Sequence, residues 1–266
     1  MARKLMHVTA PCLLRMVAAG FLGVLLSGCP VRAPSPGPQP AVPAAPQAPA
    51  EAPAAHLGTP YDIVPQESLL TILVFRAGTL ASAGHNHLIA SHSLSGTIYV
   101  PPELAAVSVE VHVPLAALTV DEEALRAAEM NRDFPPQVSD AAKEGTRRNM
   151  LGSALLNAAD YPQIILRSIS VAPAADNAAA DGAAAAPATA LVQVRMQAEV
   201  RAEQRILVVP VHYERSDTTV IASGELPLRQ TTLGLAPFSA MLGALQVQDE
   251  MRVRFRIVAR TPPKAL

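Results

Sequence analysis

The chain has 266 residues, of which 50% are hydrophobic and 16% are charged, and its formal net charge is −1. It contains no tryptophan and only 3% aromatic residues, which disfavours stacking on carbohydrate or on single-stranded nucleic acid. We expect no nucleic-acid partner, because basic residues are not in excess over acidic ones.

The first residues resemble a bacterial lipoprotein signal. Basic residues precede the apolar run Met16–Leu26, which has the length of a secretory hydrophobic region and is too short to span a membrane. The sequence Leu-Ser-Gly-Cys then ends at Cys29. We predict a signal peptide over residues 1–28 and lipidation of Cys29; the alternative is an ordinary secretory signal with an accidental cysteine.

This resemblance implies a place in the bacterial cell envelope, with the chain anchored to a membrane through Cys29 and facing the periplasm. Pro30, rather than an acidic residue, follows the cysteine, which favours the outer membrane. Cleavage removes three cations and no acid, and leaves 18 basic against 22 acidic residues. Cys12 is lost and Cys29 is acylated, so no cysteine remains for a disulfide, a zinc cluster or a nucleophile.

Two segments are too biased in composition to form a packed core. Residues 29–58 are rich in proline and alanine, with nine prolines between Pro30 and Gly58, and predict an extended tether. Residues 172–190 are rich in alanine but interrupted by proline, glycine and aspartate, and predict an exposed insertion between two strands. The folded domain is therefore expected over residues 59–262.

Within this domain the apolar residues alternate with period two far more often than with the helical period. Val107–Val113 is the cleanest example, since four valines share one face while Ser108, Glu110 and His112 share the other. The predicted strands are Leu69–Phe75, Leu94–Val100, Val107–Val113, Ile164–Val171, Leu191–Val200, Ile206–His212, Thr219–Leu228 and Met251–Ala259.

Helices are few in this pattern. Asp121–Met130 has acids in its first turn, and a second helix is expected within Asp140–Ala159. Strands that follow one another without intervening helices pair antiparallel, so the fold class is mainly all-β. Eight such strands form either a closed barrel or a sandwich, and the pattern alone leaves both open.

Five segments resemble the YceI-like family in the family's order. They are Tyr61–Phe75, Ala83–Val100, Ser108–Asp121, Leu155–Val171 and Leu226–Phe255. The resemblance covers most of residues 61–260 and implies an antiparallel, eight-stranded, lipocalin-like β-barrel with one or two short helices that binds a polyisoprenoid lipid. The chain departs from the family at Arg201–Arg205, where glycines are missing, so the shape of that hairpin stays open.

Three of the seven histidines lie close together, at His85, His87 and His92. On a strand the first two share a side and the third faces the other way. No Asp, Glu or Cys between Gly78 and Pro102 completes a ligand set, so we expect no metal; the alternative is a site on His85 and His87. Otherwise these histidines satisfy backbone groups at a turn or meet a lipid head group.

No serine or cysteine stands in a recognisable elbow or triad context, so we predict neither catalysis nor a cofactor. Leu233–Gly243 is either a flap over one end of the cavity or a short helix packed on the barrel end. The candidate ligand-binding residues are Phe75, His85, Asn86, His87, Ile98, Leu235, Phe238, Met241 and Leu242.

The function predicted from the sequence is that of an envelope lipoprotein that binds or carries an apolar, polyisoprenoid-like lipid inside a barrel. Aliphatic inward positions make such an interior dry, and each buried methylene contributes about 0.8 kcal/mol. The alternatives are a histidine-dependent metal-binding envelope protein and a structural module whose barrel is filled by its own side chains.

Overall fold

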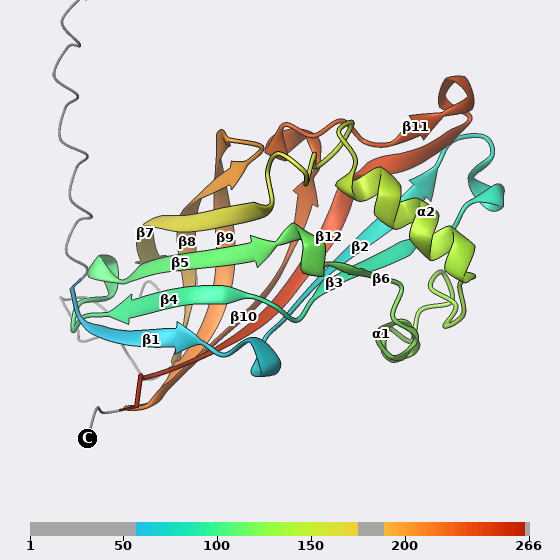
Figure 1. Ribbon diagram of the computed structural model, residues 1–266. Helices are drawn as coiled ribbons and strands as arrows, with labels where there is room; N and C mark the ends of the chain where they lie inside the picture. Colours follow the sequence, from blue (N-terminus) through green and yellow to red (C-terminus); the bar gives the residue numbers. More distant parts are fainter. Residues whose placement is uncertain (1–56, 175–188, 264–266) are drawn as a thin grey trace, which may run out of the picture. The chain divides into compact units, whose positions relative to one another are not determined.

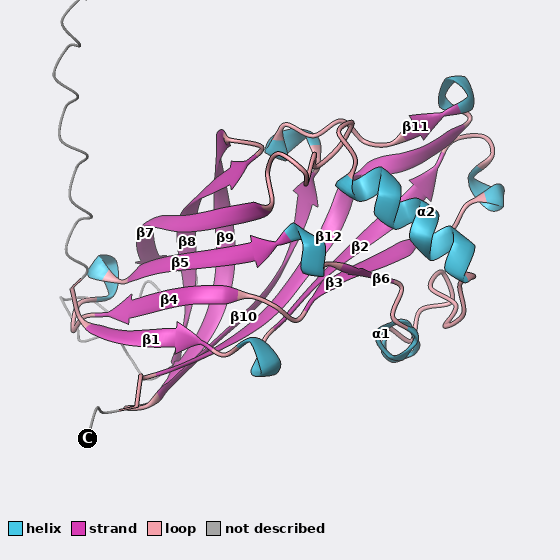
Figure 2. Cartoon of the chain, viewed as in Figure 1, coloured by secondary structure: helices cyan, strands magenta, loops and turns pink. Residues whose placement is uncertain are grey.

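The computed structural model describes residues 57–174 and 189–263. Within these ranges the chain is mainly β-structure, with two short helices, α1 (Glu123–Ala128) and α2 (Asp140–Leu151) (Figure 2). The strands are β1 (Thr59–Ile63), β2 (Leu69–Ala77), β3 (His87–Ser91), β4 (Ser95–Val100), β5 (Ser108–Pro114), β6 (Thr119–Val120), β7 (Gln163–Pro173), β8 (Thr189–Val200), β9 (Glu203–Arg215), β10 (Thr219–Arg229), β11 (Ser239–Ala240) and β12 (Leu245–Arg260).

Eight strands close into an antiparallel barrel in the order β1–β4–β5–β7–β8–β9–β10–β12 (Figure 1). The ring closes where β12 pairs with β1, at Asp62↔Arg260 and Ile63↔Ala259. β12 is long enough to pair with β2 as well, and β3 and β6 extend the sheet from there. The mainly-β fold predicted from the sequence is confirmed, and the closure shows that it is a barrel rather than a sandwich.

Each of the eight predicted strands is present, because their alternation is long enough to stand out. The largest difference is in β12, which begins at Leu245 rather than at Met251. The short strands β1, β3, β6 and β11 have no counterpart in the prediction, since two to five residues carry too little periodicity to be distinguished from a loop.

The hairpin between β8 and β9 forms without the glycines usual for the family. Its pairing runs to Val200↔Glu203, so Arg201 and Ala202 alone make the turn. Both residues have positive φ, at 53° and 59°, as a two-residue hairpin turn of the common primed type requires. The chain thus accepts backbone strain at two non-glycine residues to keep a tight connection here.

The two predicted helices are both present; α1 is shorter than the predicted Asp121–Met130, and α2 lies within the predicted range Asp140–Ala159. α1 begins two residues after Asp121, because this aspartate has a φ of 55° and its side chain bonds elsewhere. α2 begins where the Ser139 hydroxyl caps the Ala142 amide, and ends before Gly152. Its last turn carries the buried Met150, which faces the barrel interior.

A second, smaller core lies outside the barrel, on the other face of β2 and β3. It consists of Leu73, Leu88, Ala90 and Phe134, and the last of these comes from the segment after α1. Alternate residues of β2, such as Ile72, face the interior instead. The segment that contains α1 is therefore packed against the barrel wall, and buried polar side chains lie beside it.

Several sequence predictions lie outside the described residues. These are the signal peptide over residues 1–28, the lipidation of Cys29, nearly all of the tether over residues 29–58, and residues 175–188 of the alanine-rich insertion. They stay predictions. In the ranges that the structure does describe, no helix is both long and apolar enough to cross a bilayer.

Candidate functional site

The barrel encloses an apolar cavity of about 290 Å³. Among its described lining residues, only Tyr213, Arg215 and Gln230 have polar side chains; the others are aliphatic, apart from one phenylalanine. The interior therefore contains an apolar cavity, which disfavours the alternative of a barrel filled by its own side chains. A volume of this size is at the lower end of the range for small-molecule sites.

The cavity follows directly from the alternation in the strands. The four valines of Val107–Val113, three of them in β5, all line it, as their shared face predicts. In β8 the inward residues Val192, Val194 and Met196 are buried while the residues between them are exposed. The same side chains thus hold the fold together and form the wall of the site.

The two ends of the cavity differ in chemistry. At one end the wall is completed by Met150 of α2 and by Leu155 and Leu156, which follow it. At the other end β9 contributes Tyr213 and Arg215. Burial raises the pKa of the Tyr213 phenol against the opposing effect of the Arg215 charge, so the phenol stays protonated at neutral pH.

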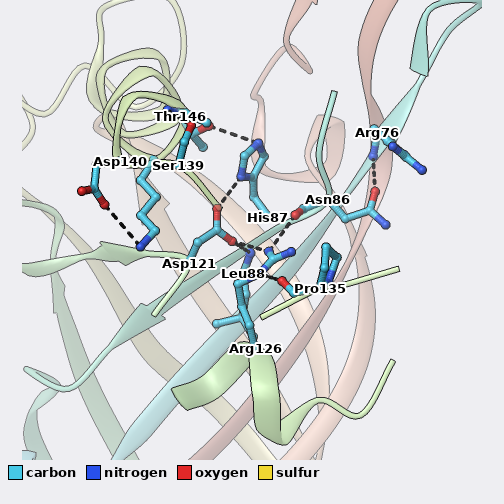
Figure 3. Close-up of polar contacts among 12 residues, drawn as sticks. Arg76, Asn86, His87, Leu88, Asp121, Arg126, Pro135, Ser139, Asp140 and Thr146 are labelled. Carbon is cyan, nitrogen blue, oxygen red and sulfur yellow. Dashed lines mark hydrogen bonds and ion pairs between the residues drawn. The ribbon is translucent and has the colours of Figure 1, made fainter. Parts of the chain in front are cut away.

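A buried polar network lies outside the barrel, between β3, α1 and α2 (Figure 3). Asp121 Oδ2 is 2.6 Å from His87 Nδ1, and its Oδ1 accepts hydrogen bonds from the Leu88 amide at 2.8 Å and from Arg126 Nη1 at 2.5 Å. Arg126 also donates to the carbonyls of Asn86 and Pro135. Asp121 and Arg126 are completely buried, so this is a desolvated ion pair that the hydrogen bonds keep in place.

His87 connects this network to α2. Its Nε2 is 3.1 Å from the Thr146 hydroxyl, and the tautomer protonated on Nδ1 donates to Asp121 and accepts from Thr146 (Figure 3). The order hydroxyl, imidazole, carboxylate is that of a hydrolase triad. Thr146 lies within α2, however, where the neighbouring backbone amides bond inside the helix and are not free to serve as oxyanion donors, so the arrangement fits an anchor better than a catalyst.

The pKa of Asp121 gives this network a pH dependence. Burial raises that pKa, but hydrogen bonds from His87 and the Leu88 amide, with the charges of His87 and Arg126, bring it below its ordinary value of 3.8. A carboxyl with a depressed folded pKa stabilises the fold above its unfolded pKa, and this stability is lost as the pH falls through the folded value.

We therefore expect the difference in unfolding free energy between wild type and Asp121→Asn to narrow as the pH falls from about 6 to about 3. The asparagine variant has no carboxyl to protonate at this position, whereas the wild type loses its ion pair with Arg126. Urea unfolding of both proteins across this range measures the difference. A difference in unfolding free energy that stays constant or widens towards acid pH would contradict the conclusion that the ionised Asp121 carboxylate stabilises the fold.

The predicted ligand-binding residues fall into three groups, of which two lie in or beside the barrel wall and the third lies in the segment Leu233–Gly243. Ile98 and Leu235 line the cavity. Asn86 is buried, accepts a hydrogen bond from the Arg76 amide and donates to the Asp133 carbonyl, while Phe75 packs edge-to-face on Phe134 outside the barrel. The rings of His85 and His87 lie 6.2 Å apart in the same outer region. A role of this second group in ligand binding stays a prediction.

The segment Leu233–Gly243 is neither a helix packed on the barrel end nor a closed flap in this structure. It makes a short 3-10 turn at Thr231–Leu233, and then β11 leads to a projecting turn (Figure 1). There Met241 and Leu242 have positive φ and are strongly exposed, and Phe238 is about one-third exposed. Whether these three side chains contact a ligand stays a prediction.

Two further histidines of the described chain each pair with one carboxylate. His92 lies 3.1 Å from Glu122, and His112 lies 2.6 Å from Glu110. In the described residues no group of three or more His, Cys, Asp or Glu side chains is placed to hold a metal ion. Arg126, Thr146, Tyr213 and Arg215 are not among the site residues predicted from the sequence.

An eight-stranded antiparallel barrel around a dry cavity is the architecture of the lipocalin-like ligand-binding barrels. Comparison with protein-family models found no match, and comparison with curated proteins found none either. The fold is similar to that of BcnA from Burkholderia cenocepacia, with a TM-score of 0.51 and 16% identity, over 74% of this chain and 99% of that chain.

Two further solved structures are more distantly similar. A polyisoprenoid binding domain from Saccharophagus degradans, implicated in plant cell wall breakdown, has a TM-score of 0.47 and 13% identity, over 76% of this chain and 98% of that one. The YceI protein of Campylobacter jejuni has a TM-score of 0.42 and 8% identity, over 64% and 82%. The similarity to BcnA supports the barrel fold.

Proposed function

We propose that this protein binds or carries an apolar, polyisoprenoid-like lipid in the cavity of its barrel, without turnover and without a cofactor. The observation that carries the proposal is the lining of the cavity, which is aliphatic almost throughout. Such a wall offers few polar groups to bind a sugar, a nucleotide or a metal, and it has a large apolar area to bind a hydrocarbon chain.

Apolar burial alone is strong enough for this task. About ten buried carbons contribute about 8 kcal/mol before the costs of association, which is comparable to the free energy of micromolar binding. A polar head group then needs only a few contacts. Tyr213 and Arg215 lie at one end of the cavity and are suited to a hydroxyl or an anionic group there.

The proposal includes the place of the protein in the cell. A lipoprotein signal over residues 1–28 would anchor Cys29 in the bacterial envelope, facing the periplasm and preferably at the outer membrane. The proline-rich tether would let the barrel work at a distance from its anchor. The resemblance to lipoprotein signals supports this part.

Mass spectrometry of the full chain, purified from cells in mild detergent, tests the proposal. We expect a non-covalent adduct with the mass of an apolar lipid under native conditions, and its loss under denaturing conditions. The lipid at Cys29 is covalent and persists in both, and Cys29→Ser removes it without touching the cavity. A metal adduct, or a protein whose cavity stays empty when isoprenoid alcohols are added, would contradict the proposal.

A further inference from the structure

The wall of the barrel is not hydrogen-bonded all the way round. β9 and β10 pair from Val220↔Arg215 to Ser223↔His212, and among the described residues their register ends there. On their other edges both strands stay paired, β9 with β8 as far as Val200↔Glu203 and β10 with β12 as far as Arg229↔Glu250. Figure 1 shows β9 and β10 diverging from the point where they are paired. We call this unpaired stretch the seam.

The sequence explains why the ladder stops. Continuing the register would place Pro210 opposite Glu225 and Pro227 opposite Val208, and neither proline has an amide hydrogen to donate. Proline is therefore tolerated in these strands only where the facing edge is free. Gly224 stands at the end of the paired part, where a Cβ atom would lie 2.4 Å from the Pro210 carbonyl.

A groove on the outer surface follows the seam. It is lined by residues 206–208 of β9 and residues 226–229 of β10, with Thr232 and Glu250 at its margin. Leu207, Leu226 and Leu228 line this groove and also the interior cavity. At the seam, three leucine side chains are thus shared between the cavity and the outer surface.

The β9 side of the seam is apolar at the outer surface as well, while Arg229, Thr232 and Glu250 come from the other side. Ile206 and Val208 point outward from β9 and are 46% and 56% exposed. Together with the leucines they give a continuous apolar path from the surface into the barrel. A hydrocarbon chain on this path would not have to leave apolar contact.

We propose that the seam is a lateral portal through which the hydrocarbon chain of an isoprenoid-like lipid enters and leaves the cavity, with Leu207, Leu226 and Leu228 moving aside. This rests on the proposed function. Side chains that change rotamer open the seam without breaking any ladder, whereas opening the wall elsewhere breaks a row of backbone hydrogen bonds. The end near Met150 is covered by α2, which the His87–Thr146 contact connects to β3.

Cross-linking across the seam tests the portal. Val208→Cys with Pro227→Cys places two exposed thiols on opposite sides of the seam, and His212→Cys with Ser223→Cys places two on the paired part of the same strands. Both pairs are made in the full chain carrying Cys12→Ser and Cys29→Ser, and are bridged by one reducible bifunctional thiol reagent. The probe is retinol, an isoprenoid alcohol whose fluorescence rises in apolar surroundings.

Stopped-flow uptake of retinol should slow by about tenfold or more when the seam is bridged, recover on reduction, and stay unchanged when the paired part is bridged. Equal rates in the two bridged proteins would overturn the portal and leave lipid binding intact. No fluorescence rise in the unbridged protein would overturn the proposed function, and the portal with it.

A second pair of variants tests the leucines without a cross-link. Leu228→Ala shortens a side chain of the seam, and Leu166→Ala makes the same change in the cavity wall on β7, away from the seam. Retinol exchange should be several-fold faster in Leu228→Ala than in Leu166→Ala. Equal exchange rates in these two variants would overturn the portal.

Discussion

Replacing Asp121 by asparagine is expected to lower the free energy of unfolding by about 3 kcal/mol or more. The change removes one charge from a pair whose two members are completely buried, and leaves Arg126 charged in a site from which water is excluded. Asparagine tolerates positive φ about as well as aspartate, so the backbone at φ 55° adds little to the loss. Urea unfolding at neutral pH measures the effect.

The neighbouring residue provides the matched control. Glu122 also pairs with a histidine, but its side chain and that of His92 are 32% and 49% exposed. Solvent screens such a pair, so Glu122→Gln should cost at most about 1 kcal/mol. Similar losses of unfolding free energy in Asp121→Asn and Glu122→Gln would show that the buried network stabilises the fold no more than an exposed pair does.

The buried network of Asp121, Arg126 and His87 is connected to the cavity wall through α2. His87 reaches Asp121 on one side and Thr146 of α2 on the other, and α2 places Met150 in the cavity wall. The buried ion pair outside the barrel is thus linked through His87 to the helix that forms one end of the cavity wall. We therefore expect a variant that destabilises this network to affect the end of the cavity formed by α2 as well.

The part of the structure that periodicity describes could be predicted from the sequence. The alternation of Val107–Val113 identifies both a strand and the face that lines the cavity. The same alternation, followed along β9 past Val211, places Tyr213 and Arg215 inside the barrel. The polar end of the cavity is therefore predictable from the sequence. The predicted strand Ile206–His212 stops short of Tyr213 and Arg215, because these two residues do not continue its apolar pattern.

The polar network could not be predicted, because it joins residues far apart in the chain. Arg126 follows the ordinary pattern of a helix whose charged residues face solvent, yet it is completely buried. Its burial depends on Asp121 and on carbonyls of two other segments, and no local spacing encodes that arrangement. The histidine cluster was noticed for its composition, but its partner Thr146 lies 59 residues away.

Filling the cavity should abolish most of its affinity for an apolar lipid. Val194 lies on β8, is 6% exposed and points into the cavity, so Val194→Trp places an indole where the ligand would lie. If three or four methylenes are excluded at about 0.8 kcal/mol each, affinity falls on the order of 100-fold. Gln193→Trp puts the same ring on the exposed outer face of the same strand and should leave affinity unchanged.

Equilibrium titration of these two variants and the wild type with retinol tests the central claim most directly. The wild-type chain has no tryptophan, so each introduced indole also reports its own surroundings, apolar inside the barrel and aqueous outside. The account predicts tight binding by wild type and Gln193→Trp, and binding on the order of 100-fold weaker by a folded Val194→Trp. Equal affinity in all three proteins, or no binding by the wild type, would contradict it.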